Sequence, residues 1–238
     1  MGKVISIWSA GGGVGKTAVA IALAENLKKN RKTVLADFKE ITPHVHRHFN
    51  LPLTDKSDIY EAVLNDQNLE EVMEKHLHRK NGLWIMTGFG LDSFMEFEAR
   101  HFSAVLDFLR KEFDYVVVDT YGGIFLSSVY SALKHSDVIF AVSTQEAVNI
   151  EDTAEMIGFV SSRWVIDKNK FKVIINEMLD KKSAELEFIQ KALENEIFFV
   201  RQGQKNVVRD VGRIVKTLFC EPQGKRFFLK EVKLGGVN

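Results

Sequence analysis

The chain has 238 residues, of which 45% are hydrophobic and 27% are charged, as is typical of a folded globular protein. Its 32 Lys and Arg side chains balance 32 Asp and Glu side chains, so no overall charge recruits nucleic acid or a membrane surface. The single Cys220 excludes an internal disulfide framework and a cysteine-only cluster site. No signal peptide and no transmembrane run stand out, so we expect a cytoplasmic protein.

The first predicted elements are a strand at 3–8, a glycine-rich turn and a helix at 16–30. The turn ends in Gly15-Lys16-Thr17, which is the end of a phosphate-binding loop. Glycines let backbone N–H groups curl around an anion, and the helix that follows points its positive dipole end at the same place. Lys16 would reach the β- and γ-phosphates, and Thr17 would place its hydroxyl on Mg²⁺.

The loop departs from the general phosphate-loop pattern, which has glycine at the position of Ala10. The alternative is a turn that merely joins a strand to a helix. Because strand, loop and helix follow in the order that the motif requires, we expect a nucleotide site. The residues expected to surround the nucleotide phosphates are Gly11, Gly12, Gly13, Val14, Gly15, Lys16, Thr17 and Ala18.

Apolar strands and amphipathic helices alternate along the rest of the chain. This pattern predicts an α/β protein: a three-layer α/β/α fold with a mostly parallel, doubly wound sheet of about seven or eight strands. With only three prolines and no flexible linker, a single domain over 1–238 is favoured, with 224–238 as a tail. Further strands are expected at 33–37, 83–87, 114–119, 137–143, 171–176 and 197–200. Further helices are expected at 57–65, 68–78, 97–112, 124–134, 147–163, 182–195 and 204–219.

The expected strand at 114–119 ends in a carboxylate and is followed by Gly122 and Gly123. In a parallel sheet the ligand crevice lies at the carboxyl ends of the strands. Asp119 is therefore placed to hold Mg²⁺ through water, as a second acidic anchor does in phosphate-loop enzymes. The two glycines would let the backbone respond to a γ-phosphate. The alternative is a buried strand that ends in a plain turn.

These segments together resemble the deviant phosphate-loop ATPases of the MinD/ParA family over nearly the whole chain. The segments that carry the resemblance are 9–17, 31–37, 114–123, 143–146 and 173–176. The resemblance implies that Asp37 and Asp119 are the carboxylates of switches I and II and would join Thr17 around Mg²⁺. It also implies that Asn176 recognises adenine through its amide, which both donates and accepts. A strand-end cap is the alternative for Asn176.

Two departures from the family pattern concern catalysis. The family's signature lysine, which reaches a partner's phosphates across a dimer, is replaced by Gly11. The second switch I aspartate, which orients the attacking water, is replaced by Lys39. Charge-stabilising groups of this kind can be worth roughly 10³–10⁵ in rate. The catalytic candidates that remain are Lys16, Asp37, Asp119 and Lys39. The resemblance thus implies retained nucleotide binding with weak hydrolysis, or none.

Lys39 itself has two interpretations. Its ammonium could supply part of the positive charge that Gly11 lacks near the γ-phosphate, or it could be a solvated lysine on a flexible stem.

The function that the resemblance implies is an ATP-dependent switch. ATP and Mg²⁺ would bind, the chain would form a nucleotide-dependent homodimer, and the dimer would position a protein partner, DNA or membrane-associated machinery. The alternative is a non-hydrolysing localisation scaffold similar to the CpaE/TadZ pilus proteins, which resemble this chain around 82–88 and 114–123. The protein partner is not named by the sequence.

Two C-terminal segments are candidates for contact with a platform. The expected helix at 204–219 carries a basic stripe, which is either a solvated face or a contact for DNA phosphates. The stripe consists of Lys205, Arg209, Arg213 and Lys216, and the same spacing extends back to Arg201 just before the helix. The opposite, core-facing positions are expected to be Val207, Val208, Val211, Ile214, Val215 and Leu218. The tail at 224–238 mixes basic and apolar residues, as MinD-like membrane helices do, with packing against the domain as the alternative. Either contact would place the protein on the nucleoid or at the inner face of the membrane.

Five of the seven histidines lie between residues 44 and 78: His44, His46, His48, His76 and His78. If the first three lay on one side of an extended segment, they would suggest a zinc site. Because no cysteine or clear fourth ligand accompanies them, a solvated loop after switch I is favoured.

Overall fold

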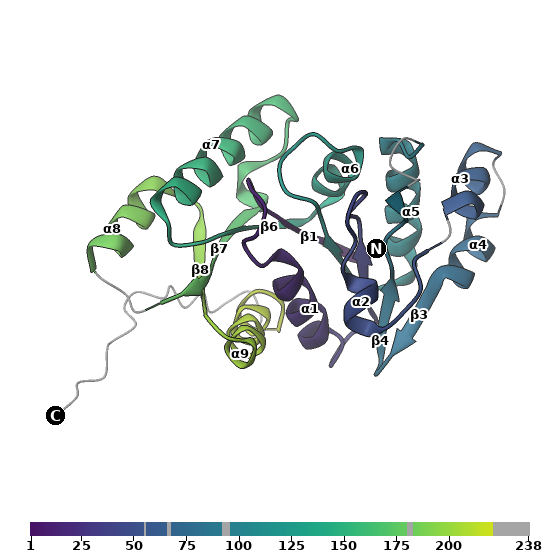
Figure 1. The fold of residues 1–238 in the computed structure, drawn as a ribbon, viewed down its shortest axis with the longest axis horizontal. Helices are drawn as coiled ribbons and strands as arrows, with labels where there is room; N and C mark the ends of the chain where they lie inside the picture. Colours follow the sequence, from purple (N-terminus) through teal and green to yellow (C-terminus); the bar gives the residue numbers. More distant parts are fainter. Residues whose placement is uncertain (55, 66–67, 92–95, 180–182, 221–238) are drawn as a thin grey trace.

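The computed structural model describes residues 1–54, 56–65, 68–91, 96–179 and 183–220. These residues contain an eight-stranded sheet in the order β3-β4-β2-β5-β1-β6-β7-β8 (Figure 1). All described pairings are parallel except β3 with β4. The strands are β1 Lys3–Trp8, β2 Thr33–Asp37, β3 Leu77–Lys80, β4 Leu83–Met86, β5 Tyr115–Asp119, β6 Val138–Ser143, β7 Phe171–Met178 and β8 Glu196–Arg201. The predicted mostly parallel α/β sheet is confirmed.

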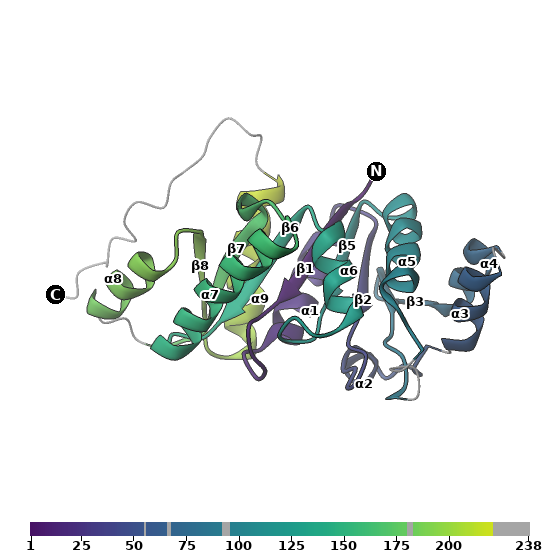
Figure 2. The same ribbon diagram turned by 90° about the horizontal axis from the view of Figure 1, so that it is seen from above.

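Helices cover both faces of this sheet. On one face α1 and α9 share a core with β1, and on the other α5, α6 and α7 pack over the strands (Figure 1). Figure 2 shows α3 and α4 outside α5, beside the β3 edge of the sheet. The helices are α1 Lys16–Leu27, α2 Val45–Phe49, α3 Lys56–Leu64, α4 Leu69–His76, α5 Ala99–Glu112, α6 Ser127–His135, α7 Ala147–Arg163, α8 Ser183–Ala192 and α9 Gln204–Val215. The described residues also contain two short helical turns, η2 Lys168–Lys170 and η3 Lys216–Cys220.

The central strands are apolar along their length because both of their faces are covered. Val116, Val117 and Val118 of β5 are fully buried, and they alternate between the cores on the two faces. The parallel register then brings the strand ends together, since Asp37 at the end of β2 pairs with Asp119 at the end of β5. The loops after β1, β2 and β5 therefore meet at one edge of the sheet, where a ligand crevice is expected.

The structure differs from the predicted elements at the β3 edge. The helix expected over 68–78 ends at His76, and Leu77–Lys80 forms β3, antiparallel to β4. The turn between them is Asn81-Gly82, with φ of 48° and 83°. Two successive residues with positive φ close a tight hairpin whose twist matches its strands. The expectation was wrong because the helix was extended into Leu77 and His78, which belong to the strand that leads into the Asn-Gly turn.

Candidate functional site

The loop between β1 and α1 depends on glycine at its last position. Gly15 has φ 85° and directly precedes Lys16, the first residue of α1. A Cβ on Gly15 would lie 2.3 Å from Nδ2 of Asn176. A side chain at this position would therefore be excluded both by the left-handed backbone and by the neighbouring strand. The N–H groups of the first turn of α1, which have no partner within the helix, begin at this loop and can bind an anion.

The Lys16 side chain folds back over its own loop and is only 7% exposed. Its Nζ donates to Ser9 Oγ at 2.7 Å and to the Gly11 carbonyl at 3.3 Å. Burial lowers the pKa of Lys16 to about 8, with Asp119 raising it and Lys39 lowering it further. Ser9 was not among the predicted site residues, yet its hydroxyl makes the shorter of these two contacts with the loop lysine.

The low pKa of Lys16 gives a pH prediction. Nucleotide affinity should be constant below about pH 8 and should fall up to about tenfold per pH unit above it, because phosphate favours the charged ammonium. Calorimetric titration of ADP from about pH 7 to about pH 9.5 tests this. The free energy of unfolding of the nucleotide-free protein should change with pH in the opposite direction to the nucleotide affinity. The folded state loses the proton first, so its free energy of unfolding should rise with pH between about 8 and 10.5. Constant affinity across the range would contradict the prediction.

The segments after β2 and β5, which are the expected switches I and II, meet beside this lysine in a buried cluster. Thr17 Oγ1 donates to Asp119 Oδ2 at 2.7 Å. Lys39 Nζ donates to both of these atoms. The side chains of Lys39 and Asp119 are 7% and 0% exposed. The interpretation of Lys39 as a solvated lysine is therefore wrong, and the ammonium lies where the hydroxyl and carboxylate converge.

Asp37 supports the backbone of switch I. Its Oδ1 accepts from the Lys39 N–H at 3.2 Å, and its Oδ2 accepts from the His44 and Val45 N–H groups at 2.8 and 2.9 Å. Burial, and then repulsion from Asp119, raise the pKa of Asp37 to about 6 despite these bonds. Both oxygens thus hold the chain segment that carries Lys39, and the role of Asp37 at a metal stays a prediction.

Switch II packs directly against the phosphate loop. The Gly123 N–H donates to the Ser9 carbonyl at 2.9 Å, and the buried Trp8 indole donates to the Gly123 carbonyl at 2.7 Å. A Cβ on Gly122 would lie 2.6 Å from the Gly11 carbonyl oxygen, so the two loops approach too closely for a side chain there. Movement of one loop would therefore move the other.

Glu40 joins switch I to α6. Its Oε1 accepts from the Ser128 N–H at 2.7 Å, which satisfies a free donor in the first turn of the helix. Burial raises the pKa of Glu40, although the bond to Ser128 acts against it. The sequence carries no signal for this contact, because the partners lie 88 residues apart.

Asn176 lies against the phosphate loop from β7. Its Nδ2 donates to the Val14 carbonyl at 3.0 Å, and the residue is 2% exposed. The next residue, Glu177, has φ 57°, and the pairing of β7 with β8 shifts register there. Such an irregularity re-aims neighbouring side chains. The buried Oδ1 of Asn176 finds no donor among the described residues. It can accept from a ligand amine, and adenine contact stays a prediction.

The site fits a nucleoside polyphosphate better than it fits Mg²⁺. The loop, the start of α1 and the Lys16 ammonium form an anion site. Thr17 and Asp119 offer oxygen atoms of the kind that Mg²⁺ prefers, and Asp119 Oδ1 is buried without a donor among the described residues. However, Thr17 Oγ1 and Asp119 Oδ2 both already contact Lys39 Nζ. Mg²⁺ does not fit between them while the ammonium is there.

The histidines do not form a metal site in the part of the chain that the structure describes, where no group of three or more His, Cys, Asp and Glu side chains could hold an ion. His46 and His48 lie on the short helix α2 rather than on an extended segment. The zinc interpretation therefore finds no support, and His44 contributes its backbone N–H to Asp37 instead.

The basic stripe is partly neutralised by one buried carboxylate. Asp210, 5% exposed, accepts from Arg201 Nη2 at 2.6 Å and has Arg209 Nε and Arg213 Nη1 each at 3.6 Å. Lys205 is exposed, and Lys216 is exposed on η3 rather than on α9. The predicted core position of Val208 is wrong, since that residue is 47% exposed. Whether the stripe contacts DNA stays a prediction.

The 224–238 tail lies outside the described residues. Within the described ranges, none of the helices combines the length and apolar character needed to cross a membrane.

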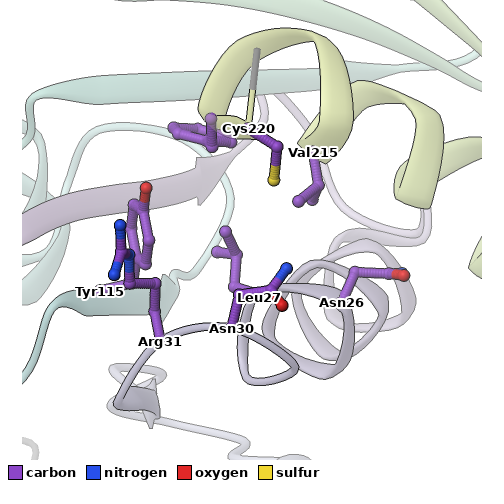
Figure 3. A pocket seen from close by; sticks show the side chains of 8 residues that line it. Asn26, Leu27, Asn30, Arg31, Tyr115, Val215 and Cys220 are labelled. Atoms are coloured by element: carbon purple, nitrogen blue, oxygen red, sulfur yellow. The ribbon is translucent and has the colours of Figure 1, made fainter. Parts of the chain in front are cut away.

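A cavity of about 260 Å³ lies between α1 and η3 (Figure 3). Arg31 and Tyr115 lie on one side of it, and Val215 and Cys220 lie on the other. Tyr115 begins β5, whereas the phosphate loop follows the end of β1, so this cavity is at the opposite edge of the sheet. It is not part of the phosphate site.

Comparison with known proteins supports the assignment of the loop. A family model described as an AAA domain matches residues 2–175. The septum site-determining protein MinD of Helicobacter pylori is 25% identical over 164 residues, which cover 68% of this chain and 60% of that protein. The chain therefore spans less than two thirds of this relative's length.

Two solved structures share the fold. The ParA family ATPase from Chlorobium tepidum TLS has a TM-score of 0.75 at 16% identity, over 92% of this chain and 93% of that chain. The septum site-determining protein MinD from Pyrococcus horikoshii OT3, complexed with Mg-ADP, has a TM-score of 0.70 at 18% identity, over 88% and 86%. The matched residues 2–175 include the phosphate loop and both switches. The chain therefore belongs to this AAA-domain family and, within it, to the MinD/ParA family of P-loop ATPases.

Proposed function

We propose that this protein is a nucleotide-binding switch of the MinD/ParA type. It binds ATP and ADP at the loop before α1, pairs as a homodimer in the nucleotide-bound state, and positions a protein partner, DNA or membrane-associated machinery. The observation that carries the proposal is the buried contact of Thr17, Lys39 and Asp119 beside the phosphate loop. Three chain segments that would sense a phosphate are already in contact there.

Several features of the loop support phosphate binding. Lys16 contacts its own loop through Ser9 and Gly11, and a phosphate group would offer its ammonium stronger, charged acceptors. Gly15 keeps Cβ atoms out of the turn. The relative from Pyrococcus horikoshii holds Mg-ADP, and the equivalent loop in this chain would take the nucleotide phosphates.

Hydrolysis should be weak or absent because, among the residues that the structure describes, no group replaces the missing aspartate. Lys39 stands where the family has the carboxylate that orients water, and a protonated lysine has donors but no acceptor for a water proton. Gly11 has no side chain to reach a partner's phosphates. Asp119 is buried and already accepts two hydrogen bonds at Oδ2.

A non-hydrolysing scaffold of the CpaE/TadZ kind is the second candidate. The burial of Lys39 favours it, since an ammonium fixed between the two switches would hold them together without nucleotide. In that case the chain would pair and recruit its partner in the same way with ATP, with ADP or alone.

Two exposed lysines near the C-terminal end of the described chain are the candidate contacts for a DNA platform. Lys205 and Lys216 are exposed and have no ion pair among the described residues, whereas Arg209 and Arg213 share Asp210. DNA binding would therefore depend mainly on the two lysines, with a peripheral position on the nucleoid. The tail at 224–238 is the corresponding candidate for a membrane.

One experiment tests the switch against the scaffold. Molecular mass in solution is measured by light scattering with ATP, with ADP and without nucleotide, together with nucleotide affinity and phosphate release. A dimer that forms only with ATP supports the switch. A nucleotide-independent dimer without phosphate release supports the scaffold. Failure to bind either nucleotide would overturn the switch.

A further inference from the structure

We propose that Lys39 is a built-in cation that takes the place of Mg²⁺ between Thr17 and Asp119, so that this site binds nucleotide without depending on a divalent metal. The inference rests on the proposed nucleotide binding and concerns the ion that accompanies the nucleotide. It is a property of this chain's own residues, because it follows from a lysine at the second switch I position.

The Thr17 hydroxyl contacts both Asp119 and Lys39. The Thr17 hydroxyl donates its only proton to Asp119 Oδ2, and its oxygen accepts from Lys39. Asp119 Oδ2 accepts from both partners. One nitrogen thus contacts oxygen atoms of two of the three residues that the resemblance places around the metal, Thr17 and Asp119. A metal ion bound to the same two atoms would have to displace the ammonium.

The Lys39 ammonium also has an N–H donor left for a nucleotide phosphate. A lysine has three N–H donors, and two of them are directed at Thr17 and Asp119. The third is available for a phosphate oxygen. Lysine binds phosphate as a compact point charge. Because Thr17 directly follows the phosphate-loop lysine, the Lys39 ammonium that contacts Thr17 Oγ1 lies beside the loop that would hold the phosphates.

Charge balance favours one cation over two. The buried site contains Lys16, Lys39, Asp37 and Asp119, two positive and two negative groups, so its formal charge is zero without a metal. A dication beside the Lys39 ammonium would be repelled at short range in a buried environment. Without the lysine charge the same site would be negative and would attract a dication, as the family's acidic switch I does.

The backbone that leads into Lys39 is held by two hydrogen bonds. The Lys39 N–H donates to Asp37 Oδ1, and the Phe38 N–H donates to the Asp119 carbonyl at 2.9 Å. Switch I is thereby tied to β5 where the side chain departs. The ammonium is therefore presented to the site by an anchored segment.

The test compares nucleotide affinity with excess Mg²⁺ and with EDTA. ADP is titrated into the wild-type chain and into Lys39→Gln, which keeps a polar side chain without the charge. The wild-type dissociation constant should change by less than about twofold on removal of Mg²⁺, whereas Lys39→Gln should lose about tenfold or more. Lys168→Gln is the matched control. Lys168 is also ion-paired, to Glu194 at 2.6 Å, but lies at the opposite edge of the sheet, so the variant should behave as wild type.

Manganese provides a second readout that does not involve activity. With Mn²⁺ and ADP, electron paramagnetic resonance should show little protein-bound Mn²⁺ in the wild type and about one ion per bound nucleotide in Lys39→Gln. A wild-type chain that loses affinity in EDTA as strongly as the variant, or that binds Mn²⁺ in step with ADP, would overturn the inference and leave nucleotide binding intact. Absence of ADP binding in every condition would overturn the proposed function and the inference together. If Lys39→Gln fails to fold, the wild-type measurements decide alone.

Discussion

Replacing Gly15 by alanine should abolish measurable nucleotide binding and lower the free energy of unfolding by about 2 kcal/mol or more. Gly15 has φ 85°, a conformation that costs an L-residue about 1–2 kcal/mol. The new Cβ would also lie 2.3 Å from Asn176 Nδ2, so either the loop or β7 must move. Either shift would displace Lys16, the next residue. Calorimetry with ADP and urea unfolding measure the two effects.

Gly12→Ala is the matched control within the same loop. A Cβ on Gly12 would have no atom within 4 Å, and its φ is not in the left-handed region. Its free energy of unfolding should therefore stay close to that of the wild type. The double variant Gly15→Ala/Asn176→Ala separates the two causes, because it removes the clash and keeps the backbone strain. A Gly15→Ala chain with wild-type stability and wild-type ADP affinity would show that the loop geometry described here is wrong.

The parts of the site that could be predicted from sequence are those determined by short segments. The order of strand, Gly15-Lys16-Thr17 and helix is local, and so is the carboxylate that ends β5. Alternation of apolar strands and helices predicts the parallel sheet, and a parallel sheet then brings Asp37 and Asp119 together as register partners. The long-range meeting of the two switches thus follows from local patterns.

The contacts that could not be predicted depend on side-chain direction. Sequence places Lys39 near the γ-phosphate, but only the packing of β2 beside β5 shows that its ammonium contacts Thr17 and Asp119 rather than water. Glu40 is similar, because its partner Ser128 is distant in sequence. The prediction that Val208 faces the core was wrong for a simpler reason. Helical periodicity gives a face only to within about one residue, and this valine lies just beyond the edge of the buried face.

The second large effect is expected at the buried ion pair of Lys39 and Asp119. Asp119→Asn should lower the free energy of unfolding by about 3–5 kcal/mol, because it leaves the buried Lys39 ammonium without its carboxylate. Lys39→Met should cost less, about 1–3 kcal/mol, because Asp119 keeps the Thr17 hydroxyl and the nearby Lys16 charge. Urea unfolding without nucleotide or added metal measures both variants.

The double variant Lys39→Met/Asp119→Asn completes the cycle and distinguishes a buried pair from two independent positions. If the two charges stabilise each other, the double variant should be less destabilised than the sum of the single variants by about 2–3 kcal/mol. The exposed pair of Lys168 and Glu194 provides the comparison, since it has a 2.6 Å contact but both side chains are at least half exposed. The cycle Lys168→Met/Glu194→Gln should show no measurable coupling, because water screens such a pair. Equal coupling in the two cycles, or strictly additive effects at Lys39 and Asp119, would mean that the ammonium does not hold the two switches together. The case for Lys39 as the resident cation would then lose its energetic basis.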